Sequence, residues 1–139
     1  MSMRHLIYNV LSATAGIQQV YSERIIDAGQ LGDTEGQPPE FPYLAVKYGE
    51  RLPGPNRTSF VVEVEFWSYD DPYDYSRTEK GLDAIFDALD NRAGGSATVD
   101  GVTTHLIEAH WLTTSRDFTD DALRASAKYA TYRLVGNRQ

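Results

Sequence analysis

The side chains in this sequence that could support chemistry are its carboxylates and its histidines. Asp70, Asp71 and Asp74 crowd one short segment, and clustered carboxylates offer the oxygen ligands that calcium and magnesium prefer. The segment lacks the regular spacing and the bidentate glutamate of a calcium loop, so a solvated turn that precedes a helix is the favoured interpretation. His105 and His110 lie an odd number of positions apart in one predicted strand. They should therefore face opposite sides of that strand and could not bind one metal ion together.

Glu63 and Glu65 form the other pair of carboxylates whose spacing catalysis could use. Two positions apart in a strand, they share one face, as an acid and base pair would. A strand face that meets solvent or another protein explains the pair more simply. The sequence contains no GxSxG, HExxH or Walker pattern, and its lack of cysteine excludes thiol catalysis and disulfides. These observations predict a protein that is not an enzyme, with no catalytic site, no metal site and no cofactor.

The overall charge restricts the partners that the protein can bind. Its 13 Lys and Arg against 20 Asp and Glu give a formal net charge of −7 at pH 7. That balance argues against a protein that grips nucleic acid by its phosphates, and against adsorption to an anionic membrane. No apolar run approaches the roughly 20 residues needed to cross a bilayer.

Tyrosine is unusually frequent, with nine residues, and this points to protein partners. Tyr69, Tyr73 and Tyr75 crowd the acidic turn, and tyrosine is enriched at protein interfaces because it joins a large apolar body to a polar tip. Packing within the chain is the alternative role for these side chains. The composition thus favours a surface built for association.

The elements that would position these residues are helices and strands in one chain. Apolar side chains at helical spacing predict a helix over residues 4–13 and a further helical turn over 17–21. Strict alternation predicts the clearest strand over residues 58–68, with Glu63 and Glu65 on the face opposite its apolar side chains. The other expected elements are a strand over 43–48, a helix over 76–93, a hairpin of 97–99 with 102–113, a polar turn over 116–121, and a final strand over 126–135. For the last segment, the composition leaves a helix as the alternative.

The helix over 76–93 should cover the sheet. Ser76 and Glu79 have the spacing of a capping box, and Gly94 and Gly95 should end the helix. Its apolar side chains recur at i, i+3, i+4 and i+7 and should all face the core. They are Leu82, Ile85, Phe86 and Leu89, and they should oppose Phe60, Val62, Val64 and Phe66. In the hairpin, alternation places Ile107, Ala109 and Trp111 on one face.

Two segments rich in glycine and proline, residues 29–39 and 49–57, are expected to be contact loops. Loops held by a rigid sheet commonly carry binding, and Arg51 and Arg57 in the second loop could serve as charge partners. The element order α-β-β-β-α-β-β-β predicts one α+β domain over residues 1–139, an antiparallel or mixed β-sheet packed by two helices.

The order of four segments resembles one family. A short helix leads into VYSERIIDAG, a Pro/Gly loop leads into FPYLAVKYGE, the strand SFVVEVEFWSYDD ends in an acidic turn, and the helix SRTEKGLDAIFDALD follows before a hairpin and a last strand. This arrangement resembles the tail terminator proteins (also called tail completion or minor tail proteins) of long-tailed, non-contractile bacteriophages and related phage-like particles. The resemblance spans nearly the whole chain and is weakest from Trp111 onward.

The resemblance implies a structural protein of the virion. Proteins of this family form a six-membered ring on the head-proximal end of the tail tube, stop its polymerisation, and join the tail to the head at the neck. The implied partners are other copies of the chain, the tail tube protein and a head-completion or connector protein. DNA would pass through the ring without specific binding. The implied location is the tail or neck of the virion, assembled in the bacterial host cytoplasm.

This function gives roles to particular side chains. Arg51, Arg57, Tyr69, Asp70, Asp71 and Tyr73 are expected at a contact with a neighbouring subunit or the tube. Glu63 and Glu65 are expected to face the channel, where carboxylates repel phosphates and keep DNA mobile. The alternatives are a head-tail connector or head-completion neck protein, a bacterial baseplate protein or the cap of a contractile tail, and a small α+β enzyme or ligand-binding domain. The last would need a pocket with convergent polar groups.

Overall fold

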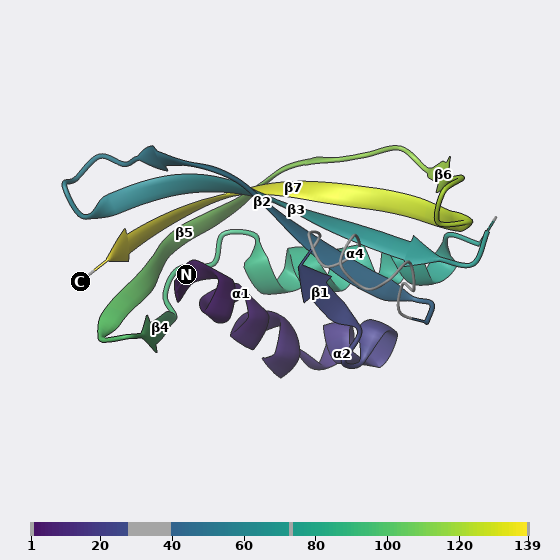
Figure 1. The fold of residues 1–139 in the computed structure, drawn as a ribbon, viewed down its shortest axis with the longest axis horizontal. Coiled ribbons are helices and arrows are strands. Elements are labelled where there is room, and N and C mark those ends of the chain that lie inside the picture. Colours follow the sequence, from purple (N-terminus) through teal and green to yellow (C-terminus); the bar gives the residue numbers. More distant parts are fainter. Residues whose placement is uncertain (1, 28–39, 73, 139) are drawn as a thin grey trace.

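A long, strongly twisted β-sheet crosses the molecule and carries the helices on one face (Figure 1). The computed structural model describes residues 2–27, 40–72 and 74–138. In this part of the chain the sheet has seven strands in the order β1-β2-β3-β7-β5-β4, with β6 also paired to β7. The strands are β1 (Ile25–Asp27), β2 (Tyr43–Pro53), β3 (Ser59–Asp70), β4 (Ser96–Val99), β5 (Val102–Thr114), β6 (Phe118–Asp120) and β7 (Ala125–Arg138). The helices are α1 (Ser2–Ala13), α2 (Ala15–Tyr21) and α4 (Ser76–Leu89).

The α+β class and the mixed sheet are confirmed, but the element order differs from the prediction. The described residues form three helices rather than two, because the turn after α1 is a separate helix, α2. The predicted order places three strands before α4 but assigns residues to only two of them. The remaining one is β1, which pairs with β2 in parallel, with Ile25 opposite Leu44. The expected polar turn over 116–121 contains the short strand β6, which continues the line of β5 along β7. The final strand is confirmed as β7.

The expected loop over 49–57 is mostly strand. A bulge between Tyr48 and Arg51 inserts one extra residue, so β2 continues to Pro53 and stays paired with β3. Only residues 54–58 turn, and the hydroxyl of Ser59 donates to the carbonyl of Asn56 at 3.0 Å. The bulge also moves Arg51 onto the face of Val62, which alternation alone would not have predicted. The other expected loop, residues 29–39, lies outside the described residues.

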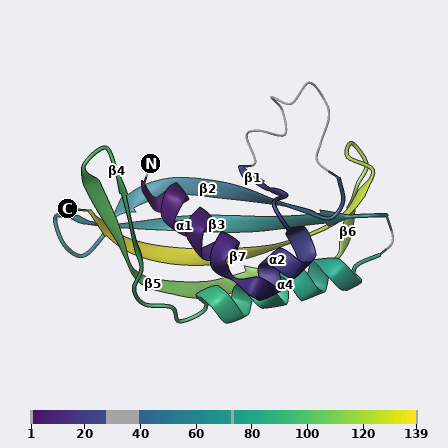
Figure 2. The same ribbon diagram turned by 90° about the horizontal axis from the view of Figure 1, so that it is seen from below.

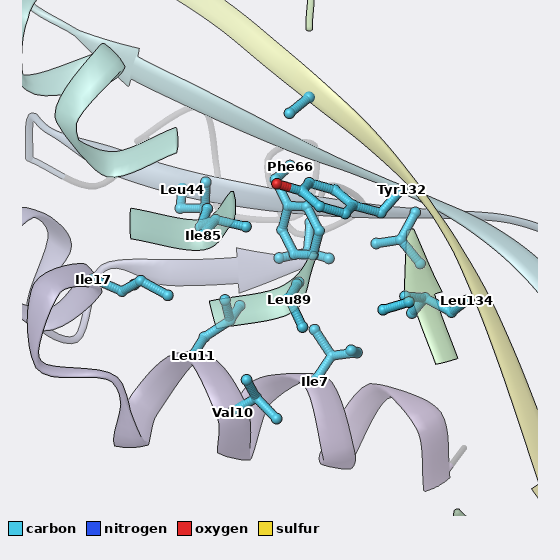
Figure 3. Packing of buried hydrophobic residues seen from close by; sticks show 14 of the residues in the cluster. Ile7, Val10, Leu11, Ile17, Leu44, Phe66, Ile85, Leu89, Tyr132 and Leu134 are labelled. Atoms are coloured by element: carbon cyan, nitrogen blue, oxygen red, sulfur yellow. The ribbon is translucent and has the colours of Figure 1, made fainter. Parts of the chain in front are cut away.

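The core lies between the helices and the sheet (Figure 3). Ile7 and Leu11 of α1, and Ile85 and Leu89 of α4, are fully buried. The sheet supplies the predicted apolar face of β3, together with β7, where the ring of Phe66 meets Tyr132 edge-on at 5.5 Å between centroids. Burying each large apolar side chain contributes about 1.5–3 kcal/mol, so this layer dominates the stability of the fold.

The prediction that Phe86 belongs to this core is wrong. Its side chain is 40% exposed, whereas Leu82, Ile85 and Leu89 are buried. Phe86 points to the flank of α4 beside β5, where its ring contacts Trp111 edge-on at 5.9 Å between centroids. The helix is also shorter than expected, because it ends at Leu89 and the next residue, Asp90, is extended.

The capping box at the start of α4 is also wrong. The carboxylate of Asp74 accepts hydrogen bonds from the backbone N–H of Ser76 at 3.1 Å and from its hydroxyl at 2.8 Å. These bonds from Ser76 hold the pKa of Asp74 below its usual value. Glu79 reaches Lys128 instead, at 3.3 Å. The N-cap position is Tyr75, which makes no side-chain cap bond, and Asp74 satisfies the free backbone N–H of Ser76 in the first turn.

Helices α2 and α4 approach each other closely at Gly81. The hydroxyl of Tyr21 is hydrogen-bonded to the hydroxyl of Ser68 at 2.6 Å, and a Cβ at Gly81 would overlap the Tyr21 hydroxyl. Burial raises the pKa of Tyr21, so it stays protonated at neutral pH. A glycine at position 81 thus allows a buried polar contact between the helical layer and the sheet.

Strand β5 has two irregularities, and one of them overturns part of the face predicted for that strand. The register shifts between Leu106 and Glu108 and again between Trp111 and Thr113. Ala109 is buried, but Ile107 is 41% and Trp111 44% exposed. The first bulge adds one residue and so turns Ile107 away from the face of Ala109. Trp111 keeps the face of Ala109, as predicted, since the two lie opposite Tyr132 and Leu134 of β7.

Candidate assembly surfaces

The outer face of the sheet, opposite the helices, carries an aromatic cluster at the β6 end. Trp67 stacks on Tyr129 with centroids 4.3 Å apart, and Tyr69 stacks on Tyr43 at 5.0 Å. Phe41 and Phe118 pack against the same cluster. Tyr69 is only 6% exposed, and burial raises the pKa of Tyr43 to about 12. Tyr69, expected at an interface, is therefore used for packing within the chain.

Asp70 is also used within the chain. Its side chain is fully buried, and its carboxylate accepts two hydrogen bonds from the guanidinium of Arg77, one of them from Nε at 2.8 Å. Arg77 also reaches the exposed carboxylate of Asp71 at 3.3 Å. The bonds to Asp70 raise the pKa of Arg77. This pair holds the first turn of α4 against the end of β3. Asp71 is exposed, and Tyr73 lies outside the described residues.

Glu63 and Glu65 lie on the outer face, as predicted, and each has a basic residue opposite it. Glu63 is exposed and pairs in register with Arg133 of β7. Glu65 is half-buried, accepts a hydrogen bond from Trp67 Nε1 at 3.0 Å, and lies opposite Lys47 of β2. Opposite charges across a strand pair attract each other. This part of the face therefore has mixed charge rather than purely acidic charge.

Arg51 and Arg57 come together with a third arginine at the end of the β2–β3 hairpin. These two and Arg138 line one hollow, which we call the basic hollow, together with Leu52, Pro53, Asn56, Thr58, Ser59, Phe60 and Val102. The Arg51 guanidinium lies over the ring of Phe60, 4.7 Å from its centroid. The N–H of Arg138 donates to the carbonyl of Thr58 at 3.0 Å, which fixes the end of β7 beside the hairpin. No carboxylate is among the described residues that line the hollow.

A second hollow lies between α4 and β5 and was missed from the sequence. This α4–β5 groove is lined by Glu79, Leu82, Asp83, Phe86, Trp111, Thr114, Lys128 and Tyr132. Lys128 is engaged by two carboxylates, Glu79 and Asp117, each at 3.3 Å. Burial raises the pKa of Tyr132, and the nearby carboxylates of Asp90, Asp83 and Asp87 raise it further. The groove went unnoticed because the helical pattern assigned Phe86 to the core.

The histidines and carboxylates form no metal centre in the part of the chain that the structure describes, where no three of them gather closely enough to hold an ion. The bulge in β5 places His105 and His110 on the same face, opposite Asn137 and Arg133, so the predicted opposite orientation is wrong. Those two partners are four positions apart in one strand, roughly 13 Å, which is too far for one ion. His110 instead lies 3.2 Å from Glu108.

Comparison with known proteins finds a likeness of fold. No family model matches the sequence, and no curated protein matches it. A chain from the virion of a native gene transfer agent particle has a similar structure, with a TM-score of 0.72. The likeness covers 98% of this chain and 95% of that chain at 13% sequence identity. At this identity it shows a shared fold. Among the described residues no helix is long and apolar enough to span a membrane.

Proposed function

We propose that the protein is a structural component of a phage-like virion. The observation that carries this proposal is the match of fold with a virion chain over nearly the full length of both chains. The fold alone does not determine a function, because one fold can serve several. The surfaces add support, since the described residues offer hollows with unmatched charge and exposed aromatic rings rather than a set of catalytic groups.

The more specific proposal is a tail terminator. Six copies would form a ring on the head-proximal end of the tail tube, end its polymerisation, and join it to a head-completion or connector protein. A compact chain of this length has a diameter of roughly 35 Å, and six such bodies in a ring leave a hole of about one diameter. A DNA duplex passes through a hole of that width. The order of the sequence segments and the match to a virion chain support the same proposal.

In this ring, the outer face of the sheet around Glu63 and Glu65 is proposed to look into the channel. The two carboxylates would repel phosphates, while Arg133 and Lys47 opposite them limit the local negative charge. DNA would then slide past a surface that neither traps it nor excludes it. The net charge of −7 for each chain adds to the same effect.

Native mass spectrometry and negative-stain microscopy of the purified protein test the proposal. We expect six-membered rings, either for the protein alone or once tail tubes are added, and we expect them at one end of each tube. Rings that bind empty capsids at the portal and ignore tubes would favour the alternative, a head-tail connector or head-completion protein. A protein that stays monomeric with tubes and with capsids would contradict a role in assembly.

A further inference from the structure

The charges of the basic hollow have no acidic partner within the described chain. Arg51, Arg57 and Arg138 are exposed, and none of them forms an ion pair there. Three guanidinium groups in one hollow repel one another, and a carboxylate partner would relieve that repulsion. The rim is apolar as well, because Leu52 is 51% exposed and Pro53 follows it. The hollow thus suits a partner that presents both carboxylates and apolar surface.

The α4–β5 groove presents that combination. Phe86 and Trp111 are 40% and 44% exposed along the groove. Asp83 lines it, and Asp87, one helical turn further along α4, lines the adjoining hollow that Asp83 also lines. Both aspartates are exposed, and neither forms an ion pair with another described residue.

The two surfaces belong to different parts of the molecule. They share no lining residue, since the hollow is built from the β2–β3 turn, Val102 and Arg138, whereas the groove is built from α4, β5 and the first part of β7. Figure 2 shows the turn at one end, beside the C-terminus, and α4 along the flank. A contact between them therefore joins two copies.

We propose that the basic hollow of one copy docks on the α4–β5 groove of a second copy. Arg51 and Arg57 would meet Asp83 and Asp87 of the neighbour, while Leu52 and Pro53 would cover its exposed rings. Because the two surfaces differ, the contact is heterologous, and repeating it yields a ring if the rotation closes and an open filament if it does not. The inference rests on the proposed function, for which it supplies the subunit contact.

A nucleic acid is the other anionic partner that three arginines could bind. The apolar rim and the net charge of −7 favour a protein surface instead, because phosphate-binding surfaces draw their affinity from a wide basic field. Binding of duplex DNA is therefore an outcome to be tested.

Charge reversal tests the contact. We expect Arg51→Glu with Arg57→Glu to weaken self-association, measured by analytical ultracentrifugation, on the order of 100-fold, because like charges would face each other. Asp83→Lys with Asp87→Lys should weaken it similarly. All four changes in one chain should restore assembly, because the signs are opposite again. The matched control reverses Arg116 and Arg124, which are exposed and form no ion pair with a described residue, and should leave assembly unchanged. Circular dichroism checks that each variant is folded.

The outcomes separate this inference from the proposed function. If the wild-type protein forms rings and the fourfold variant stays dissociated, the docking contact is wrong and the ring stands. If copies associate through these charges but never cap a tail tube, the contact stands and the function fails. A wild-type protein that is monomeric at every concentration, with and without tubes, overturns both. Duplex DNA binding that Arg51→Glu with Arg57→Glu abolishes, with self-association unchanged, makes the hollow a phosphate site and overturns the contact.

Discussion

Arginines at two ends of the sheet have opposite surroundings. At the start of α4, Arg77 is bound to the fully buried carboxylate of Asp70, and the pair ties a helix to a strand. At the β2–β3 hairpin, Arg51 and Arg57 share a hollow with Arg138 and no described carboxylate. The first arrangement stabilises the fold, and the second leaves charge available to a partner. Arg77 is itself 44% exposed, so its pairing with a buried carboxylate, rather than exposure or residue type, separates the two roles.

The largest difference in stability is expected when one arginine is removed from each end of the sheet. We expect Arg77→Ala to reduce the free energy of unfolding by about 3–5 kcal/mol, because it leaves Asp70 buried without its charged partner. Arg57→Ala should change that free energy by no more than about 0.5 kcal/mol, as for other exposed positions. Urea denaturation of both variants measures the difference. Equal losses in the free energy of unfolding for the two variants would contradict the distinction between Arg77, which is paired, and Arg57, which forms no ion pair with a described residue.

A second pair of changes compares the core with the α4–β5 groove. Leu89→Ala should cost about 2–5 kcal/mol, because the fully buried side chain leaves a cavity. Phe86→Ala, on the same helix, should cost about 1 kcal/mol or less, since the ring is already partly in water. Thermal and chemical unfolding check both values. If Phe86→Ala lowered the free energy of unfolding as much as Leu89→Ala does, Phe86 would belong to the core.

A third test concerns the close approach of α2 and α4 at Gly81. Gly81→Ala should cost about 1–3 kcal/mol, because the new methyl group overlaps the Tyr21 hydroxyl and disturbs its bond to Ser68. The matched control is Gly16→Ala in α2, where a Cβ would meet Ala84 at an ordinary contact distance of 3.4 Å. That change should stabilise the protein by about 0.5–1 kcal/mol, as alanine does in a helix. A Gly81→Ala variant as stable as the wild type would mean that α2 and α4 can move apart without loss of stability.

The smallest effect on stability is expected on the outer face. Glu63→Lys with Glu65→Lys places like charges opposite Arg133 and Lys47, at a cost of roughly 0.2–1 kcal/mol for each pair. Folding and tail length should persist. DNA ejection should slow, and more so at low salt, where screening is weak. Single-particle ejection assays at two ionic strengths measure this. Loss of rings in this variant would place the two glutamates at a subunit contact.

Local patterns predicted most of the regular elements. Alternation in β3 and helical spacing in α1 and α4 follow directly from burying one face, so these elements and the core face of β3 were predictable. The position of strand β1 was not predicted, because it has three residues and exists through its pairing with β2. The bulges in β2 and β5 were also not predictable, and they account for the misplaced loop, the changed face of Ile107 and the orientation of the histidines.

The candidate surfaces were predictable only in part. Arg51 and Arg57 stood out because of the glycine and proline around them, but Arg138 joins them through the β3–β7 pairing of distant segments. Tyr69 and Asp70 looked like surface residues because their turn is polar. The aromatic cluster and Arg77 bury them, and no local pattern encodes such a contact.

The length of the tail tube is the most direct test of the proposal that the protein is a tail terminator. Tube protein that polymerises in the presence of this chain should give tubes of limited length, each with a six-membered ring at one end in electron micrographs. Without the chain, the tubes should grow past that length. Tubes of the same length distribution with and without the chain, and with bare ends in both cases, would contradict the account.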